Sequence, residues 1–140
     1  MLFGKRERTL KRILIVEDEP LVAFDNEHFL REAGYEIVAT VDSVTDAVEA
    51  MGNGVDLVLA DVKLSDGGNG GDVARAARDK GVPLIFATAG RPEDARALAI
   101  GLLAKPYSHR DLLAAIETVE AKLSGRALKR TPKGFTLFGE

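Results

Sequence analysis

The sequence predicts a doubly wound α/β fold, in which helices cover both faces of a parallel sheet. Short apolar, β-branched runs such as Ile13–Val16 are typical of strands buried on both faces. Segments with apolar residues at helical spacing alternate with these runs. The chain has 140 residues, 46% of them apolar and 29% charged, which suits one domain with its own core.

Five expected strands alternate with five expected helices. The strands cover residues 13–16, 35–41, 56–60, 82–88 and 102–104, and the helices cover 21–34, 43–54, 71–81, 91–101 and 108–123. Ser43 is a suitable N-cap, and Gly34 and Gly81 are suitable helix stops. Pro83 and Pro92 stand near the start of a strand and of a helix, where proline is tolerated. The last helix is expected to carry an apolar stripe made of Leu112, Ile116, Val119 and Leu123.

Charge is distributed unevenly along the chain. The net charge is −3, yet residues 1–12 carry five Lys or Arg and one Glu, and residues 126–140 carry four Lys or Arg and one Glu. We expect a basic N-terminal extension over 1–10, an acidic folded body over 11–124, and a basic, aromatic tail over 125–140. The tail is expected to be flexible, although it could dock on a partner or fold back onto the body. Nucleic-acid binding is disfavoured by the acidic body.

Composition excludes several classes of protein. The chain has no cysteine, which excludes disulfides, thiolate zinc sites and cysteine nucleophiles. No apolar run is long enough to cross a bilayer, and the N-terminus lacks the apolar core of a signal peptide. We therefore expect a cytoplasmic protein without membrane contact. The residues after Ser124 are too few for a helix-turn-helix domain, so a stand-alone domain is expected.

Polar side chains stand directly at the ends of four expected strands. They are Glu17, Asp18 and Glu19 after the first strand, Asp61 after the third, Thr88 at the end of the fourth and Lys105 after the fifth. In a doubly wound sheet, ligands bind beyond the carboxyl ends of the strands, where the strand order reverses. If the first and third strands are neighbours, these side chains converge on one pocket.

The residue types in this pocket favour phosphoryl chemistry with a divalent cation. Carboxylates at close range repel one another, and a hard cation such as Mg²⁺, which takes oxygen ligands, relieves the repulsion. Two or three carboxylates and a backbone carbonyl after Asp61 leave positions open for a phosphoryl oxygen. Asp61 is then a candidate nucleophile toward phosphorus, while Lys105 neutralises phosphoryl charge and the Thr88 hydroxyl donates to the group.

Each of these residues also has an ordinary structural interpretation. Asp61 could form a turn, and Asp18 and Glu19 could oppose the dipole of the first helix. Thr88 could be a plain strand residue and Lys105 a solvated lysine. The joint pattern favours a functional site, because these groups all stand at strand ends.

Four motifs, in this order, resemble the receiver domain of two-component response regulators over about residues 11–123. They are ILIVEDEP with the acidic pair Glu17 and Asp18, DLVLADVKLSDGGNG with the phosphoacceptor Asp61, PLIFATAG with the switch hydroxyl of Thr88, and AKPY with Lys105 and Pro106. The resemblance implies a flavodoxin-like sheet of order 2-1-3-4-5 and a cis Lys105–Pro106 bond. It implies Mg²⁺-dependent phosphotransfer to Asp61 from a histidine kinase or histidine phosphotransfer protein, with the Lys63 carbonyl on the metal. Such a protein catalyses only its own phosphorylation and dephosphorylation, and signals by protein contact.

Two positions depart from the usual receiver pattern. Receivers usually carry Tyr or Phe three residues before the lysine, where this chain has Leu102. PLIFATAG resembles an alphaproteobacterial subclass with a Phe-Ala-Thr-Gly motif and no switch aromatic, which includes single-domain regulators tied to the general stress response. Ala89 replaces the glycine of that motif. Phe86 belongs either to this motif or simply to the core, and both interpretations stay open.

Two other functions stay open. An aspartate-nucleophile phosphatase of the haloacid dehalogenase type needs a second Asp two residues after the nucleophile, where this chain has Lys63. A receiver-like binding module that works without phosphorylation is expected to have lost part of the site, which is intact here. We also expect the glycine-rich loop over 65–71 and the stretch after Thr88 to be mobile until metal and phosphate bind; in the loop, glycine loses more backbone entropy on ordering.

Overall fold

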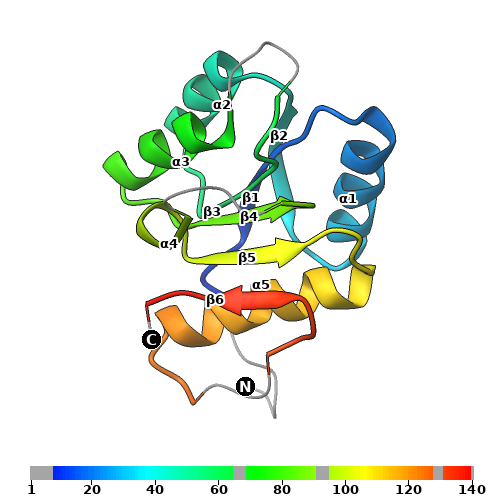
Figure 1. Ribbon diagram of the computed structural model, residues 1–140, viewed down its shortest axis with the longest axis vertical. Helices are drawn as coiled ribbons and strands as arrows, with labels where there is room; N and C mark the ends of the chain where they lie inside the picture. Colours follow the sequence, from blue (N-terminus) through cyan, green and yellow to red (C-terminus); the bar gives the residue numbers. More distant parts are fainter. Residues whose placement is uncertain (1–7, 65–68, 91–94, 128–130, 140) are drawn as a thin grey trace.

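The computed structural model describes residues 8–64, 69–90, 95–127 and 131–139, which form a six-stranded sheet between two layers of helices (Figure 1). The strands are β1 (Arg12–Val16), β2 (Glu36–Val41), β3 (Leu57–Ala60), β4 (Leu84–Thr88), β5 (Gly101–Ala104) and β6 (Phe135–Leu137). The helices are α1 (Pro20–Glu32), α2 (Val44–Ala50), α3 (Gly70–Asp79), α4 (Ala95–Leu98) and α5 (His109–Leu123), and a 3-10 turn, η1 (Met51–Asn53), follows α2. The strand order is β2-β1-β3-β4-β5-β6 with β1 to β5 parallel, which confirms the doubly wound, flavodoxin-like fold and its order 2-1-3-4-5.

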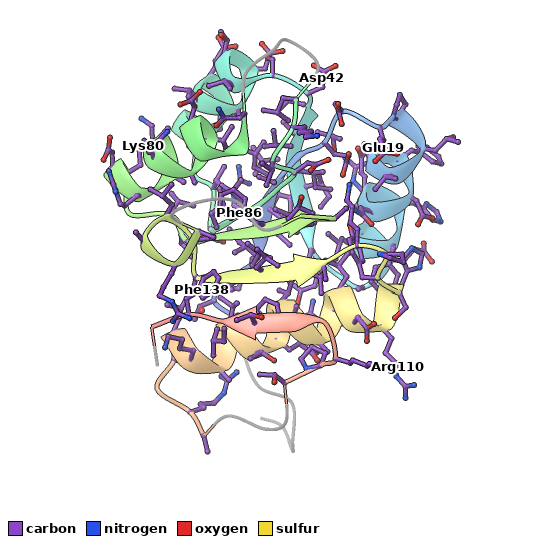
Figure 2. The ribbon with its side chains drawn as sticks, viewed as in Figure 1. Glu19, Asp42, Lys80, Phe86, Arg110 and Phe138 are labelled. Atoms are coloured by element: carbon purple, nitrogen blue, oxygen red, sulfur yellow. The ribbon has the colours of Figure 1, made fainter. Side chains whose placement is uncertain are left out.

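Two apolar clusters lie on opposite faces of the sheet. On one face, strand residues such as Leu14 and Phe86 pack with residues of α2, α3 and α4. On the other face, residues such as Ile15 and Leu103 pack with α1 and α5, which lie side by side in Figure 1. Burial on both faces explains why the strands read as continuous apolar runs. Phe86 is fully buried near the centre of the molecule (Figure 2), so it is a core residue.

Most helix signals in the sequence are confirmed. The Ser43 hydroxyl caps α2 by accepting a hydrogen bond from the backbone N–H three residues later, at 3.1 Å. Gly34 and Gly81 follow α1 and α3 with positive φ angles, as helix stops do. The prediction that Leu123 joins the apolar stripe of α5 is wrong: it is 49% exposed, because the helix ends there and solvent reaches it. In the part of the chain that the structure describes, the helices are too short or too polar to cross a membrane.

The C-terminal segment differs from the flexible tail that we expected. Residues Phe135–Leu137 form β6, which pairs antiparallel with β5 and extends the sheet (red in Figure 1). Phe135, Leu137 and Phe138 are all buried. Burial of three apolar side chains offsets the entropy lost on ordering the segment. Fold-back onto the body, the alternative considered above, is what the structure shows over these residues.

The residues that precede β1 are anchored on α5. The Glu120 carboxylate accepts hydrogen bonds from the backbone N–H groups of Thr9 at 2.9 Å and Leu10 at 2.8 Å. Its second oxygen accepts hydrogen bonds from the hydroxyls of Thr9 and Ser124. Burial by itself raises a carboxyl pKa, but these hydrogen bonds outweigh it and hold the pKa of Glu120 below its ordinary value. The chain is therefore tied to the body from Thr9 onward.

Candidate functional site

The carboxyl ends of β1, β3, β4 and β5 meet along one edge of the sheet. β1 and β3 are hydrogen-bonded neighbours, which is the condition under which the strand-end side chains converge. β2 lies on the far side of β1, so the strand order reverses between β1 and β3. Glu17 follows β1, Asp61 follows β3, Thr88 ends β4 and Lys105 follows β5. The topology therefore brings these four residues to one edge.

Lys105 lies at the centre of this edge. Its Nζ is 3.0 Å from a Glu17 oxygen, 3.1 Å from Asp61 Oδ2 and 3.4 Å from a Glu19 oxygen. Burial alone would lower the pKa of this ammonium, but its pairing with Glu17 and Asp61 raises the pKa above the ordinary value for lysine. The Lys105–Pro106 peptide bond is cis, as the resemblance implies. Lys105 thus places one positive charge among three carboxylates.

Glu17 and Glu19 come from the turn between β1 and α1. Burial raises the pKa of Glu17, and hydrogen bonds from Lys105 and from the Glu19 N–H offset only part of this effect. Glu19 is the exposed N-cap residue of α1 (Figure 2), and its side chain makes no cap hydrogen bond. Its carboxylate is instead turned toward Lys105. One turn of the chain therefore supplies two of the three carboxylates.

The three carboxylates form a group that suits a metal ion. Oxygen atoms of Glu17, Glu19 and Asp61 lie within 4.8 Å of one another. Carboxylate oxygens are the donors that Mg²⁺ takes, so the residues present fit this ion. Among the residues described, the group includes Glu19, which was not among the expected ligands, and leaves out Asp18, which was. The roles of Asp18 and of the Lys63 carbonyl as ligands stay predictions.

Asp61 holds its carboxylate in a defined orientation. Oδ1 accepts a hydrogen bond from the Val62 N–H at 2.7 Å, and Oδ2 faces Lys105. Gly70, the first residue of α3, lies against the same backbone, since a Cβ there would be 2.3 Å from the Asp61 carbonyl oxygen. Only glycine fits at this position without displacing Asp61. Sequence reasoning missed this role, although the glycine-rich loop was the signal; residues 65–68 of that loop lie outside the described part of the chain.

Thr88 is linked to Lys105 through the backbone. Its carbonyl oxygen accepts a hydrogen bond from the Lys105 N–H at 2.9 Å, and its hydroxyl oxygen accepts one from the Gly90 N–H at 3.2 Å. A hydroxyl that accepts one hydrogen bond can still donate its proton, so Thr88 keeps the capacity to bind an oxygen. Leu102 stands where receivers usually carry an aromatic residue. It is buried, and its partner on the neighbouring strand β4 is Phe86.

A second polar cluster joins α1 to the start of α5, and sequence reasoning missed it. The buried Asn26 side chain donates to the Tyr107 hydroxyl at 2.8 Å. His109 contacts Asp25 Oδ2 at 2.6 Å and stacks on Phe29, with ring centroids 4.2 Å apart. Burial raises the pKa of Tyr107, and the bond from Asn26 opposes this. The signal in the sequence was a polar residue at a core-facing position of the first helix.

Comparisons with known proteins agree with this geometry. Residues 13–117 match the sequence model of the family described as response regulator receiver domain. The transcriptional regulatory protein PdtaR of Mycobacterium tuberculosis is 40% identical over 116 residues, covering 76% of this chain and 55% of that protein. The phyllosphere-induced regulator PhyR of Methylorubrum extorquens is 35% identical over 115 residues, covering 74% of this chain and 41% of that protein. The chain spans about half the length of these curated relatives.

A solved structure shows a similar arrangement. The signal receiver domain of a modulated diguanylate cyclase from Desulfovibrio desulfuricans G20 is 29% identical and superposes with a TM-score of 0.73, covering 82% of this chain and 97% of that chain. The stretch that matches the family ends at residue 117, so β6 at Phe135–Leu137 lies beyond it.

Proposed function

The chain belongs to the response regulator receiver family, and from that premise we propose that it is a phosphoacceptor. Asp61 takes a phosphoryl group from a histidine kinase or a histidine phosphotransfer protein, and the signal passes on by contact with another protein. The chain catalyses only its own phosphorylation and dephosphorylation. The observation that carries this proposal is the position of Lys105 Nζ, 3.1 Å from Asp61 Oδ2 at the carboxyl edge of the sheet.

The chemistry follows from the groups around Asp61. A carboxylate oxygen attacks phosphorus, an O–P bond forms, and the P–N bond to the donor histidine breaks, with the leaving nitrogen keeping the electron pair. The Lys105 ammonium neutralises charge on the phosphoryl oxygens. The Thr88 hydroxyl, tied to Lys105 through the backbone, donates to the same oxygens.

The acidic edge suits Mg²⁺ as a partner of this reaction. The structure brings together the carboxylates of Glu17, Glu19 and Asp61. Two or three carboxylates from this group and Asp18, with the backbone carbonyl of Lys63, would hold the ion. Bound there, the ion supplies positive charge that reduces repulsion between the nucleophile and the phosphoryl group. Lys105 pairs with oxygens of Glu17, Glu19 and Asp61, so a cation held there would compete with it for these oxygens and would leave its ammonium available to a phosphoryl group.

Phosphorylation by acetyl phosphate with Mg²⁺ tests the proposal directly. Intact mass is expected to show one added phosphoryl group, which hydroxylamine removes because an acyl phosphate is labile. Asp61→Asn is expected to abolish the addition, while Asp79→Asn, on an exposed carboxylate at the end of α3, keeps it. Equal addition to the Asp61→Asn protein overturns the proposal. Turnover of a phosphomonoester would indicate a phosphatase, and neither response would indicate a binding module.

The similarity to PhyR supports a finer proposal about the pathway. We infer a cytoplasmic regulator of the alphaproteobacterial Phe-Ala-Thr subclass, whose motif stands at residues 86–88, acting in the general stress response. A strain that lacks the gene is expected to lose stress survival, and the wild-type gene is expected to restore it while the Asp61→Asn gene does not. Full restoration by the Asp61→Asn gene would contradict a phosphorylation-dependent role.

A further inference from the structure

The outer edge of β5 is shaped to receive an extended segment. A Cβ on Gly101 would lie 2.5 Å from Phe135 Cζ and 2.9 Å from the Thr136 carbonyl oxygen. The missing side chain at Gly101 therefore makes the space that the Phe135 ring fills. An aromatic side chain therefore fits beside β5 at this point, and a residue larger than glycine at position 101 would exclude it.

Residues 135–138 are held on this edge by the antiparallel pairing of β6 with β5 and by one further hydrogen bond at each end. The Ala104 N–H donates to the Gly134 carbonyl at 2.8 Å, and the Phe138 N–H donates to the Ile100 carbonyl at 2.9 Å. Phe138 is buried on the α4 side of the sheet (Figure 2), with the Arg96 guanidinium 5.1 Å from its ring centre. A three-residue edge strand held in this way opens more easily than the central strands.

The same edge is joined to the phosphoacceptor site through β5. Ala104, which bonds the start of the β6 segment, directly precedes Lys105, and the Lys105 N–H bonds the Thr88 carbonyl. Lys105 and Thr88 are the two groups that turn to the phosphoryl oxygens in the proposed function. We expect a movement of Lys105 or Thr88 to reach the end of β5, because the Ala104 N–H that holds Gly134 belongs to the residue directly before Lys105.

We propose that the β5 edge is an interaction surface, occupied by residues 135–138 while Asp61 is unmodified and opened by phosphorylation to an extended, aromatic-bearing segment of a partner protein. This inference rests on the proposed function of Asp61. Strand addition at a sheet edge binds extended peptides through backbone hydrogen bonds, and side-chain pockets give specificity. The space above Gly101 is the pocket here, and the chain's own Phe135 shows the kind of side chain it takes.

Residue-resolved hydrogen exchange on the full chain tests the opening. With Mg²⁺ and beryllofluoride, the amides of Ala104 and Phe138 are expected to exchange about tenfold faster, a coupling typical between linked sites. The Val58 amide, which donates to the Pro83 carbonyl inside the sheet, is expected to stay unchanged. If the signals of Asp61 shift but the two edge amides do not exchange faster, the proposed interaction surface is refuted and the proposed function stands. Signals of Asp61 that do not shift overturn both this inference and the proposed function.

A synthetic peptide of residues 131–139 tests what the open edge accepts. Wild-type protein is expected to bind the peptide at least about tenfold more tightly with Mg²⁺ and beryllofluoride than without. The Phe135→Ala protein, in which the pocket is empty, is expected to bind the peptide both with and without Mg²⁺ and beryllofluoride. Adding Gly101→Ala to that variant abolishes binding by filling the pocket, whereas Gly52→Ala, where a Cβ meets nothing within 4 Å, does not. Equal binding by wild-type protein in both states, or binding that survives Gly101→Ala, overturns the proposal.

Discussion

Glu17 and Glu120 are equally buried, each 5% exposed, yet they lie in very different surroundings. Glu120 accepts four hydrogen bonds from the N-terminal segment and from its own helix, and its pKa is lowered. Glu17 relies mainly on the Lys105 ammonium, which it shares with Asp61, and burial raises its pKa. The Glu120 carboxylate is thus satisfied largely by backbone and hydroxyl donors, while Glu17 shares a lysine with Asp61 and Glu19.

This difference separates a carboxylate that joins two parts of the chain from one that lies in the proposed phosphoacceptor site. Fixed backbone donors match a buried carboxylate permanently and join two parts of the chain. A lysine shared among several carboxylates can be replaced by a metal ion and can follow a phosphoryl group. A perturbed, exchangeable charge cluster at strand ends is therefore the better mark of function.

The largest expected effect is on the shared lysine. Lys105→Ala is expected to lower the rate of phosphorylation by acetyl phosphate about a hundredfold or more, because it removes an electrostatic contact to the transferred group. Intact mass against time, with Mg²⁺ present, gives the rate. Lys80→Ala, on an exposed lysine at the end of α3, is the matched control. A wild-type rate in the Lys105→Ala protein would show that the central charge of the site is only structural.

At the anchor, the expected effect is on stability instead. Glu120→Ala is expected to lower the free energy of unfolding by about 2 kcal/mol, because it leaves backbone donors of Thr9 and Leu10 without their charged acceptor. Urea unfolding measures the change. Glu117→Ala, at an exposed position of the same helix, is expected to cost far less. If the two variants lose equal stability, the hydrogen bonds of Glu120 do not anchor the N-terminal segment.

The two regions also differ in how far the sequence predicts them. Topology brings the strand ends of a parallel sheet together whatever the details of packing, so Asp61 and Lys105 could be placed at one site from the sequence. Glu120 pairs with Leu10, 110 residues away, and no local pattern marks that contact. β6 is three residues long, too short for a periodic signal, and it depends on the space above Gly101. The sequence therefore could not reveal contacts between residues that lie far apart along the chain.

The pKa directions predict opposite pH dependences for the two glutamates. The folded-state pKa of Glu120 lies below its ordinary 4.5, so its stabilisation is present above pH 4.5 and is lost as the pH falls through the lowered value. The folded-state pKa of Glu17 lies above 4.5, so the folded state holds that proton more tightly than the unfolded state does. Its contribution is therefore present below pH 4.5 and is lost as the pH rises through the raised value.

Matched glutamine variants in metal-free buffer measure these slopes. As the pH is lowered through 4.5, the stability gap between wild type and Glu120→Gln is expected to shrink. As the pH is raised above 4.5, Glu17→Gln is expected to gain stability relative to wild type. Urea midpoints at several pH values supply the data. If the stability difference from wild type changes with pH in the same direction for both variants, the two glutamates do not differ in the way proposed.

The smallest expected effect is on a single hydrogen bond of the anchor. The Ser124 hydroxyl donates to Glu120 at 3.2 Å, the longest of the four bonds to that carboxylate. Ser124→Ala is expected to cost about 0.5 kcal/mol, because the remaining donors still satisfy the carboxylate. A double-mutant cycle with Glu120→Gln isolates this pair from the other bonds. A coupling energy near zero would mean that the Thr9–Leu10 segment alone satisfies Glu120, and that the anchor owes its lowered pKa to donors from the far end of the chain.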